Sequence, residues 1–131
     1  MIVVDTNIIA YLLIESDHTN FATKVRRRDR NWVAPELWRS EFRNLLMLYI
    51  RRDVLTVEGA ITVFEKADGF LKTSPVNAAR IIELAAESGC TAYDCEFVSL
   101  AERLNIPLVT SDKKLLAAFP GIAVSMEAFA A

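Results

Sequence analysis

The 131-residue sequence lacks several features that would assign it to a specialised class of protein. Its only cysteines, Cys90 and Cys95, stand five positions apart with no Cys-x-x-Cys pair. This spacing argues against a disulfide framework and against a zinc site, and it is typical of thiols in a reduced cytoplasm. No apolar run approaches the ~18 residues of a membrane helix. No basic-then-apolar leader precedes the first apolar run. We therefore expect a cytoplasmic protein with no membrane partner.

The sequence also contains only one histidine and has no excess of basic residues. The single histidine, His18, lies in a polar turn and is interpreted as a surface residue, so histidine-based catalysis is not expected. The net charge of −2, from 15 basic and 17 acidic residues, argues against a nucleic-acid binder on balance alone. The basic residues are nevertheless clustered, most densely at Arg26-Arg27-Arg28. Such clusters also have a simpler interpretation, as solubilising charge on exposed helix faces.

The chain is rich in apolar residues, at 53%. That content and the length predict one packed domain over residues 1–131. Short apolar runs predict strands at residues 2–4, 32–34, 108–110 and 122–124. Helical patterns are predicted at residues 8–13, 21–30, 35–52, 57–71, 76–88, 92–104 and 113–119. Strands that are apolar throughout favour a parallel sheet covered on both faces, hence an α/β fold. The segment 35–88 is expected to form helices packed beside the sheet.

The first strand ends at a carboxylate. Ile2-Val3-Val4 is followed at once by Asp5, and then by the hydroxyl of Thr6 and the amide of Asn7. In open α/β sheets, ligands bind beyond the carboxyl ends of the strands, so Asp5 lies where an active site is expected. The alternative is that Asp5 is only the N-cap of the following helix, and both interpretations stay open at this point.

Glu41 is the second unusual acid. Its neighbours at helical spacing are Leu37, Leu45 and Leu48. Arg39 and Arg43 lie elsewhere around the helix, so a salt bridge within the helix does not explain the carboxylate. A buried charge without a partner is costly, which favours a position lining a cleft.

Asp94 and Asp112 complete the set. Asp94 opens a helix and shares its face with apolar residues, whereas Asp112 follows the apolar run 108–110. Each has a structural alternative: Thr91-x-x-Asp94 has the spacing of a capping box, and Asp112 suits the start of a helix. Glu96, two residues beyond Asp94, is expected on the surface.

Four carboxylates in one pocket would repel one another. At ~5 Å and an effective dielectric constant of ~20, each like-charged pair costs about 3 kcal/mol. Proton uptake or a bound divalent cation relieves that cost, and all-oxygen ligands suit Mg²⁺ or Mn²⁺. Such a pocket serves phosphoryl chemistry. The residues expected to support the acids are Thr6, Asn7, Thr110 and Ser111.

These motifs resemble those of a known family. Val3-Val4-Asp5-Thr6-Asn7, Ser40-Glu41, Tyr93-Asp94 and Leu108-Val109-Thr110-Ser111-Asp112 occur here in the order seen in PIN-domain ribonucleases. More narrowly, the sequence is similar to the VapC toxins of type II toxin–antitoxin systems. The resemblance covers essentially the whole chain. It implies a Rossmann-like three-layer fold around a short parallel sheet flanked by helices, and a Mg²⁺- or Mn²⁺-dependent endoribonuclease.

The resemblance also implies roles and partners. Asp5, Glu41, Asp94 and Asp112 would be the catalytic, metal-binding acids, supported by Thr6 or Asn7 and by Ser111. Water held between Asp5 and Asp94 would attack an RNA phosphodiester in line. A VapB-like antitoxin would insert its tail into the acidic groove. A homodimer is implied too, and the apolar helix from Leu37 to Ile50, with Trp38, Phe42, Leu46 and Tyr49, permits one. Candidate phosphate contacts are Arg26, Arg27, Arg28, Arg39, Arg43, Lys113 and Lys114.

Three other interpretations compete with this one. The first is a non-catalytic module of the same fold that binds RNA or a partner, although the complete set of four acids argues against it. A phosphoacceptor receiver domain would have an acidic pair after the first strand, where this chain has Asp5 alone. A hydrolase of the haloacid dehalogenase type would have a second aspartate at the position of Asn7.

Overall fold

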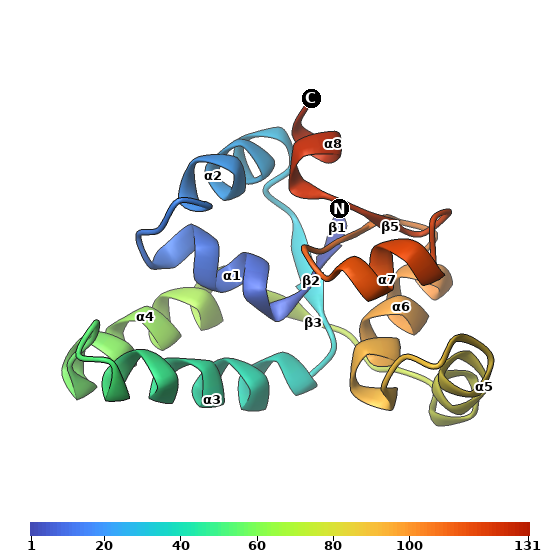
Figure 1. The fold of residues 1–131 in the computed structure, drawn as a ribbon, viewed down its shortest axis with the longest axis horizontal. Helices are drawn as coiled ribbons and strands as arrows, with labels where there is room; N and C mark the ends of the chain where they lie inside the picture. The colour runs from blue at the N-terminus through green and yellow to red at the C-terminus, as the bar shows by residue number, and fades with distance from the viewer.

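The computed structural model describes all of residues 1–131 and contains five short strands and eight helices (Figure 1). The strands are β1 (Ile2–Val4), β2 (Trp32–Ala34), β3 (Lys72–Thr73), β4 (Leu108–Val109) and β5 (Ala123–Val124). The helices are α1 (Thr6–Leu13), α2 (Thr19–Arg28), α3 (Leu37–Arg51), α4 (Val57–Phe70), α5 (Ala78–Ser88), α6 (Ala92–Leu104), α7 (Lys113–Ala118) and α8 (Met126–Ala130). This alternation confirms the predicted α/β fold class.

β1 is the central strand of the sheet. All neighbouring strands pair in parallel, in the order β3-β2-β1-β4-β5. Val3 lies opposite Val33 of β2 on one side and Leu108 of β4 on the other. The three residues of β1 are at most 1% exposed. A strand with neighbours on both sides and helices on both faces has no polar side, which explains why Ile2-Val3-Val4 is apolar throughout.

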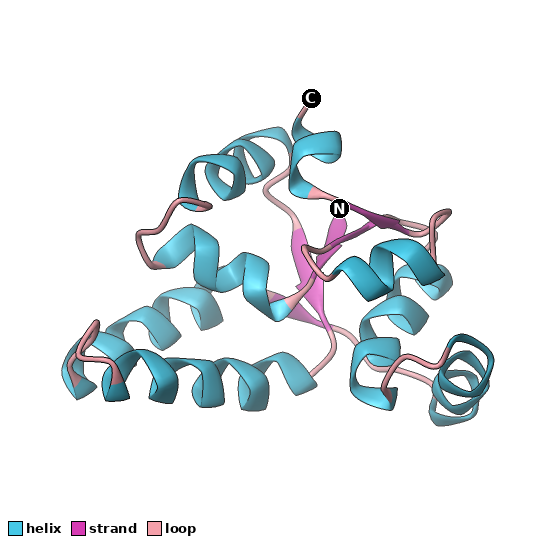
Figure 2. Ribbon diagram, viewed as in Figure 1, coloured by secondary structure: helices cyan, strands magenta, loops and turns pink.

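The helices form two layers around the sheet. Helices α1 to α4 lie on one face, and α5, α6 and α7 lie on the other (Figures 1 and 2). The chain runs outward from β1 through β2 to β3 and then returns to β4 on the far side of β1. The strand order therefore reverses between β1 and β4. In folds of this type, the crevice beyond the carboxyl ends at that reversal is the usual place for a ligand.

Helix α3 is anchored by an aromatic cluster. The ring centroid of Phe64 on α4 lies 5.5 Å from that of Trp38 and 6.2 Å from that of Phe42. Trp38 and Phe42 are fully buried and Leu46 is 4% exposed. The apolar helix was expected to permit a dimer, but these three residues are not available for one, because they are buried. The sequence pattern shows that a helix face is apolar, but not which element covers it.

The exposed apolar surface lies further along the same pair of helices. A groove of about 520 Å³ runs between α3 and α4, and seven of its nine lining residues are hydrophobic. Met47 on α3 and Val57 and Ile61 on α4 are between 39% and 57% exposed. This groove is separate from the crevice at the carboxyl edge of the sheet.

Two elements were not predicted from the sequence. β3 consists of two exposed residues, Lys72 and Thr73, that extend the sheet by pairing with Val33 and Ala34. The segment 35–88 forms helices beside the sheet as expected, but it also contributes this strand between α4 and α5. The second element, α8, is a five-residue helix capped by the Ser125 hydroxyl, which accepts a hydrogen bond from the Ala128 N–H.

Smaller features agree with their expected positions. Cys90 and Cys95 are both free and buried. His18 is exposed, and its ring centroid lies 4.4 Å from that of Tyr11. Pro35, expected at the first helical position, instead precedes the N-cap residue Glu36 of α3. None of the eight helices combines the length and apolarity that a membrane crossing demands.

Candidate active site

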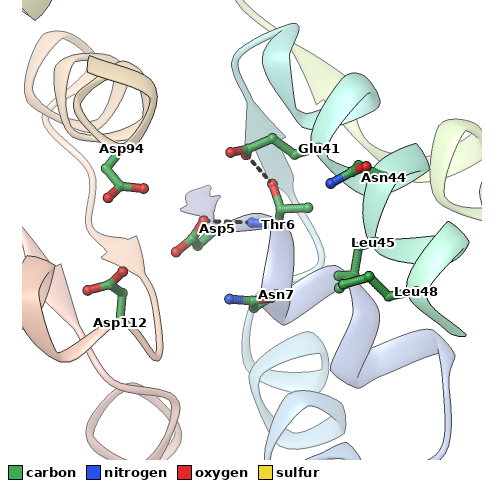
Figure 3. Close-up of a pocket in the computed structure, with 9 residues that line it drawn as sticks. All are labelled: Asp5, Thr6, Asn7, Glu41, Asn44, Leu45, Leu48, Asp94 and Asp112. Carbon is green, nitrogen blue, oxygen red and sulfur yellow. Dashed lines mark hydrogen bonds between the residues drawn. The ribbon is translucent and has the colours of Figure 1, made fainter. Parts of the chain in front are cut away.

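Four acids from four separate elements line one cavity of about 240 Å³ (Figure 3). Asp5 follows β1 directly, and Asp112 follows the neighbouring strand β4. Glu41 lies in the second turn of α3 and Asp94 in the first turn of α6. The cavity lies at the carboxyl edge of the sheet, where the strand order reverses. The structure thus brings together all four acids singled out from the sequence.

Asp5 is the most buried of the four, at 8% exposure. The Thr6 N–H donates to its Oδ1 at 2.8 Å, and the Thr110 hydroxyl donates to its Oδ2 at 2.7 Å. Burial raises the pKa of Asp5, and the charges of Asp94 and Asp112 add to the rise, while the two hydrogen bonds oppose it. Asp5 is therefore the N-cap of α1 and a member of the pocket at once.

Glu41 is joined to Asp5 through one residue. The Thr6 hydroxyl donates to Glu41 Oε1 at 2.8 Å, while the backbone of Thr6 is bonded to Asp5. Burial is the largest cause that raises the pKa of Glu41, and nearby acids add to it. One of those acids is Glu96, which is half-buried and not fully exposed as expected. Thr6 thus holds two of the acids in a fixed relation.

Asp94 is half-buried at the start of α6. Its N–H donates to the Thr91 hydroxyl at 3.0 Å, as the capping spacing predicts. Burial raises the pKa of Asp94, and the charge of Asp112 adds to the rise, while the hydrogen bond with the Thr91 side chain and the charge of Lys114 oppose it. The helix-start and pocket interpretations therefore both hold for this residue.

Asp112 divides its carboxylate between two tasks. Oδ1 caps α7 by accepting hydrogen bonds from the N–H groups of Lys114 at 2.8 Å and Leu115 at 3.1 Å. Neither hydrogen bond of the cap uses the other oxygen, Oδ2. The Asp112 N–H donates to the Thr110 hydroxyl at 3.0 Å, and that hydroxyl donates onward to Asp5. Thr110 therefore links the two acids that follow β1 and β4.

The remaining predicted supporting residues differ in position. Asn7 lines the cavity, whereas Ser111 does not. Three further lining residues, Asn44, Leu45 and Leu48, lie on α3 beyond Glu41. The two leucines are the neighbours expected at helical spacing. Asn44 was missed, although its place one turn after Glu41 is the signal that would have found it.

None of the seven basic residues expected to contact RNA lines the cavity. Arg26, Arg27 and Arg28 end α2 just before β2 begins, so they lie at the opposite, amino edge of the sheet. Arg26 lies over the Phe70 ring at 4.3 Å, and Arg39 forms a 2.6 Å ion pair with Asp68. Arg26 and Arg39 therefore have partners within the protein.

The other three basic residues differ in their relation to the pocket. Lys114 donates from Nζ to the Gly89 carbonyl at 2.7 Å, and its positive charge acts to lower the pKa of Asp94. Arg43 lies over the Phe64 ring at 5.8 Å and lines the apolar groove instead. Lys113, the first residue of α7, is exposed.

The donor set fits a hard divalent cation. The lining contains four carboxylates, two carboxamides, a hydroxyl and no Lys, Arg or His. The carboxylates are not gathered into a ready group of three ligands, as expected for like charges that repel one another. Burial is the largest cause that raises the pKa values of Asp5, Glu41 and Asp94, and the charges of neighbouring acids add to the rise. Oxygen ligands of this kind suit Mg²⁺ or Mn²⁺.

Fold and site together define a class: a three-layer α/β domain with an all-carboxylate pocket where its parallel sheet reverses. The chain belongs to the PIN-domain family, whose pattern it matches over residues 2–120. It is 29% identical over 126 residues to Ribonuclease VapC3 of Pyrobaculum aerophilum, covering 92% of this chain and 96% of that protein.

Two solved structures share the fold. PAE2754 of Pyrobaculum aerophilum superposes with a TM-score of 0.79 at 23% identity, covering 98% of this chain and 92% of its own. FitAcB of Neisseria gonorrhoeae has a TM-score of 0.70 at 16% identity, covering 97% of this chain and 99% of its own. At these identities the likeness shows the fold alone.

Proposed function

We propose that this protein is a Mg²⁺- or Mn²⁺-dependent endoribonuclease and the toxin of a toxin–antitoxin pair. The observation that carries the proposal is the convergence of four carboxylates on one cavity with no basic residue in its lining. Membership of the PIN-domain family and similarity to a protein named as a ribonuclease support it.

The acids Asp5, Glu41, Asp94 and Asp112 would hold the cation. When bound, a divalent ion polarises the oxygens of an RNA phosphate and lowers the pKa of water at the site. The chain's own contribution is position. Thr110 orients Asp5, and Thr6 orients both Asp5 and Glu41. Asp5 and Asp94 accept hydrogen bonds from the attacking water and direct it in line with the departing oxygen.

The test is cleavage of a mixed pool of transfer and ribosomal RNAs. Wild type is compared with Asp5→Asn in Mg²⁺, in Mn²⁺ and in chelator, with Asp17→Asn, a change at an exposed turn, as the matched control. The proposal requires cleavage that needs the ion, survives Asp17→Asn and disappears in Asp5→Asn. Cleavage that survives chelator and Asp5→Asn would reject the assignment of the acids.

A second readout does not depend on finding the right RNA. Calorimetric titration with Mn²⁺ should show binding to wild type and to Asp17→Asn and much weaker binding to Asp5→Asn. If Mn²⁺ binds none of them, the metal site is rejected. If it binds but no RNA is bound or cut, the non-catalytic partner-binding module becomes the better interpretation.

RNA is proposed to run from the pocket across Lys113 and Lys114 of α7, the helix that the pocket residue Asp112 caps. A longer RNA would also contact Arg39 and Arg43 on α3. Phosphate contacts of this kind make affinity fall as salt concentration rises. Arg26, Arg27 and Arg28 would reach only an RNA long enough to extend to the amino edge of the sheet. Lys113→Gln should therefore reduce the salt dependence for a short oligonucleotide, whereas Arg27→Gln should not.

Two protein partners are proposed. A VapB-like antitoxin would cover the acidic pocket and place a basic side chain among the carboxylates, which would stop cleavage. A homodimer would use the exposed apolar side chains of α3 and α4, such as Met47 and Ile61. Light scattering should find a dimer for wild type and a monomer for Ile61→Asp. A monomeric wild type would reject the dimer.

A further inference from the structure

The pocket is divided into two chemically different halves. Asp5, Asp94 and Asp112 face one another across one half, and Glu41 projects towards them from α3 (Figure 3). Asn44, Leu45 and Leu48 lie further along α3, and beyond Glu41 this second half carries no charge. A molecule that spans the cavity therefore meets carboxylates at one end and a carboxamide with two aliphatic side chains at the other.

Hydrogen-bond donors are scarce in this lining. The Thr6 hydroxyl gives its hydrogen to Glu41, and the carboxylates are acceptors. At the rim, the Lys114 amine is bonded to the Gly89 carbonyl. The hydrogen bonds among the pocket residues use neither the Asn7 nor the Asn44 carboxamide. These two amides are therefore the side-chain donors left for a substrate.

The two amides face different halves. Asn7 lies at the start of α1 beside Asp5, whereas Asn44 lies one turn beyond Glu41 and next to Leu48 (Figure 3). We place the RNA phosphate in the carboxylate half, because a cation bound there would offset the negative charge of the acids and attract the phosphate. The neutral parts of a nucleotide are left for the α3 side. A nucleobase has an apolar face and a polar edge, which match a leucine and a carboxamide.

The α3 side is suited to selective contact because it is rigid. Asn44 lies in the middle of the 15-residue helix α3, which Trp38 and Phe42 anchor in the core. Asn44 is exposed and Leu48 is 41% exposed, so both are free to contact a ligand. A donor presented on a rigid element discriminates between partners better than one on a mobile loop.

We propose that Asn44 and Leu48 form a nucleobase subsite next to the reacting phosphate, so that the pocket itself selects the base at one position of the RNA. This inference rests on the proposed ribonuclease function and extends it to sequence preference. Asn44 bonds the edge of the base through its carboxamide, and Leu48 packs against the face. Asn7 contacts the phosphate or ribose and is indifferent to the base.

The experiment is selection of short random RNAs by immobilised protein, followed by sequencing. Asp5→Asn serves as the parent so that the pool is not cut, and Mn²⁺ is kept in large excess so that Glu41, Asp94 and Asp112 still hold the cation despite the lower affinity. Asn44→Ala and Leu48→Ala are added to it, with Asn7→Ala as the matched control. Both alanines favour helix, so α3 is retained, and circular dichroism checks this. In parallel, wild type and Asn44→Ala cut the same pool with Mn²⁺, and the new ends are sequenced.

The parent should prefer one base at one position by about 5- to 150-fold, as one good base contact gives. Asn44→Ala should remove that preference, Leu48→Ala should weaken it, and Asn7→Ala should lower retention of all sequences equally. An unchanged preference in Asn44→Ala, equal loss for all sequences, or no preference in the parent would overturn the inference. RNA binding by the parent in those cases leaves the ribonuclease proposal standing. If the parent retains no RNA and wild type cuts none, the ribonuclease function is rejected and the subsite with it.

Discussion

Helix α3 carries two regions with opposite physical character. On one side, Glu41 enters a pocket of four carboxylates that no basic residue in the lining neutralises. On the other, Trp38 and Phe42 are fully buried against Phe64. Repulsion between the carboxylates of the pocket destabilises the metal-free fold, whereas burial of the aromatic side chains stabilises the position of the helix. The difference shows why function and stability should respond to separate substitutions on one helix.

The largest expected effect is the loss of cleavage in Asp5→Asn. The change keeps the shape of the side chain but removes the charge that the proposed cation needs. We expect a rate loss on the order of 10⁴-fold, the scale seen when a central catalytic group is removed. Single-turnover cleavage at saturating enzyme measures it. A rate within tenfold of wild type would remove Asp5 from the reaction.

Phe42→Ala tests the opposite region. Removing this fully buried ring should cost about 3–5 kcal/mol of unfolding free energy, because a cavity is left beneath α4. Urea unfolding measures the change. Ile82→Ala, at a position on α5 that is 66% exposed, is the matched control and should change stability little. Equal losses for the two variants would show that the aromatic cluster does not anchor α3.

Thr6→Val should have an intermediate effect on cleavage. It keeps the size of the side chain and removes the hydroxyl that donates to Glu41 at 2.8 Å. Loss of a group that orients a metal ligand typically costs about 10- to 100-fold in affinity for the metal or in activity. Measuring the cleavage rate as a function of Mn²⁺ concentration separates a loss of metal affinity from a loss of activity at saturating metal. Thr6→Ser, which restores the hydroxyl, should recover most of the activity, and failure to do so would contradict the positioning role.

The smallest effect concerns the stability of the metal-free protein. Burial and neighbouring acids raise the pKa of Asp5, so the folded state holds its proton at a pH where the unfolded chain has lost it. Stability is therefore undiminished below the ordinary carboxyl pKa and falls as pH rises through and above it. Asp5→Asn removes this penalty and should raise the melting temperature by a few degrees near pH 7, on the order of 1 kcal/mol.

That difference should shrink on acidification towards about pH 4, because wild-type Asp5 then takes up a proton. Added Mn²⁺ should reverse the order by stabilising wild type alone. Thermal melts with and without the ion, at several pH values, give both results. A melting temperature for Asp5→Asn below that of wild type in chelator would show that the Asp5 charge is compensated in the fold.

Much of this arrangement is predictable from the sequence because the signals are local. β1 and α6 begin and end where their apolar patterns predict. The residue pattern of a central strand or an amphipathic helix directly reflects which of its sides are buried. The four acids stand out for the same reason, as carboxylates at strand ends or on apolar faces. Asp5 and Asp94 also show that capping and pocket roles coexist in one residue.

What the sequence does not predict depends on contacts between distant segments. β3 is two exposed residues whose only strand character is its pairing with β2. The cluster at Arg26, Arg27 and Arg28 has the composition of a phosphate site, but its position at the end of α2 follows from the direction of β2. Asn44 has no distinctive neighbours in sequence and is recognised only once Glu41 and Leu48 line a common cavity.

The divided carboxylate of Asp112 affects how any mutational survey of the pocket should be read. One oxygen fastens the start of α7, and the other is left for the cavity. Alanine at this position would remove the cap of the helix and the proposed metal ligand together, so inactivity would not show which of the two losses caused it. Asparagine keeps an oxygen for the cap and removes only the charge. The ratio of the cleavage rates of those two variants, and not the loss of activity in either one, would show how far Asp112 takes part in the chemistry.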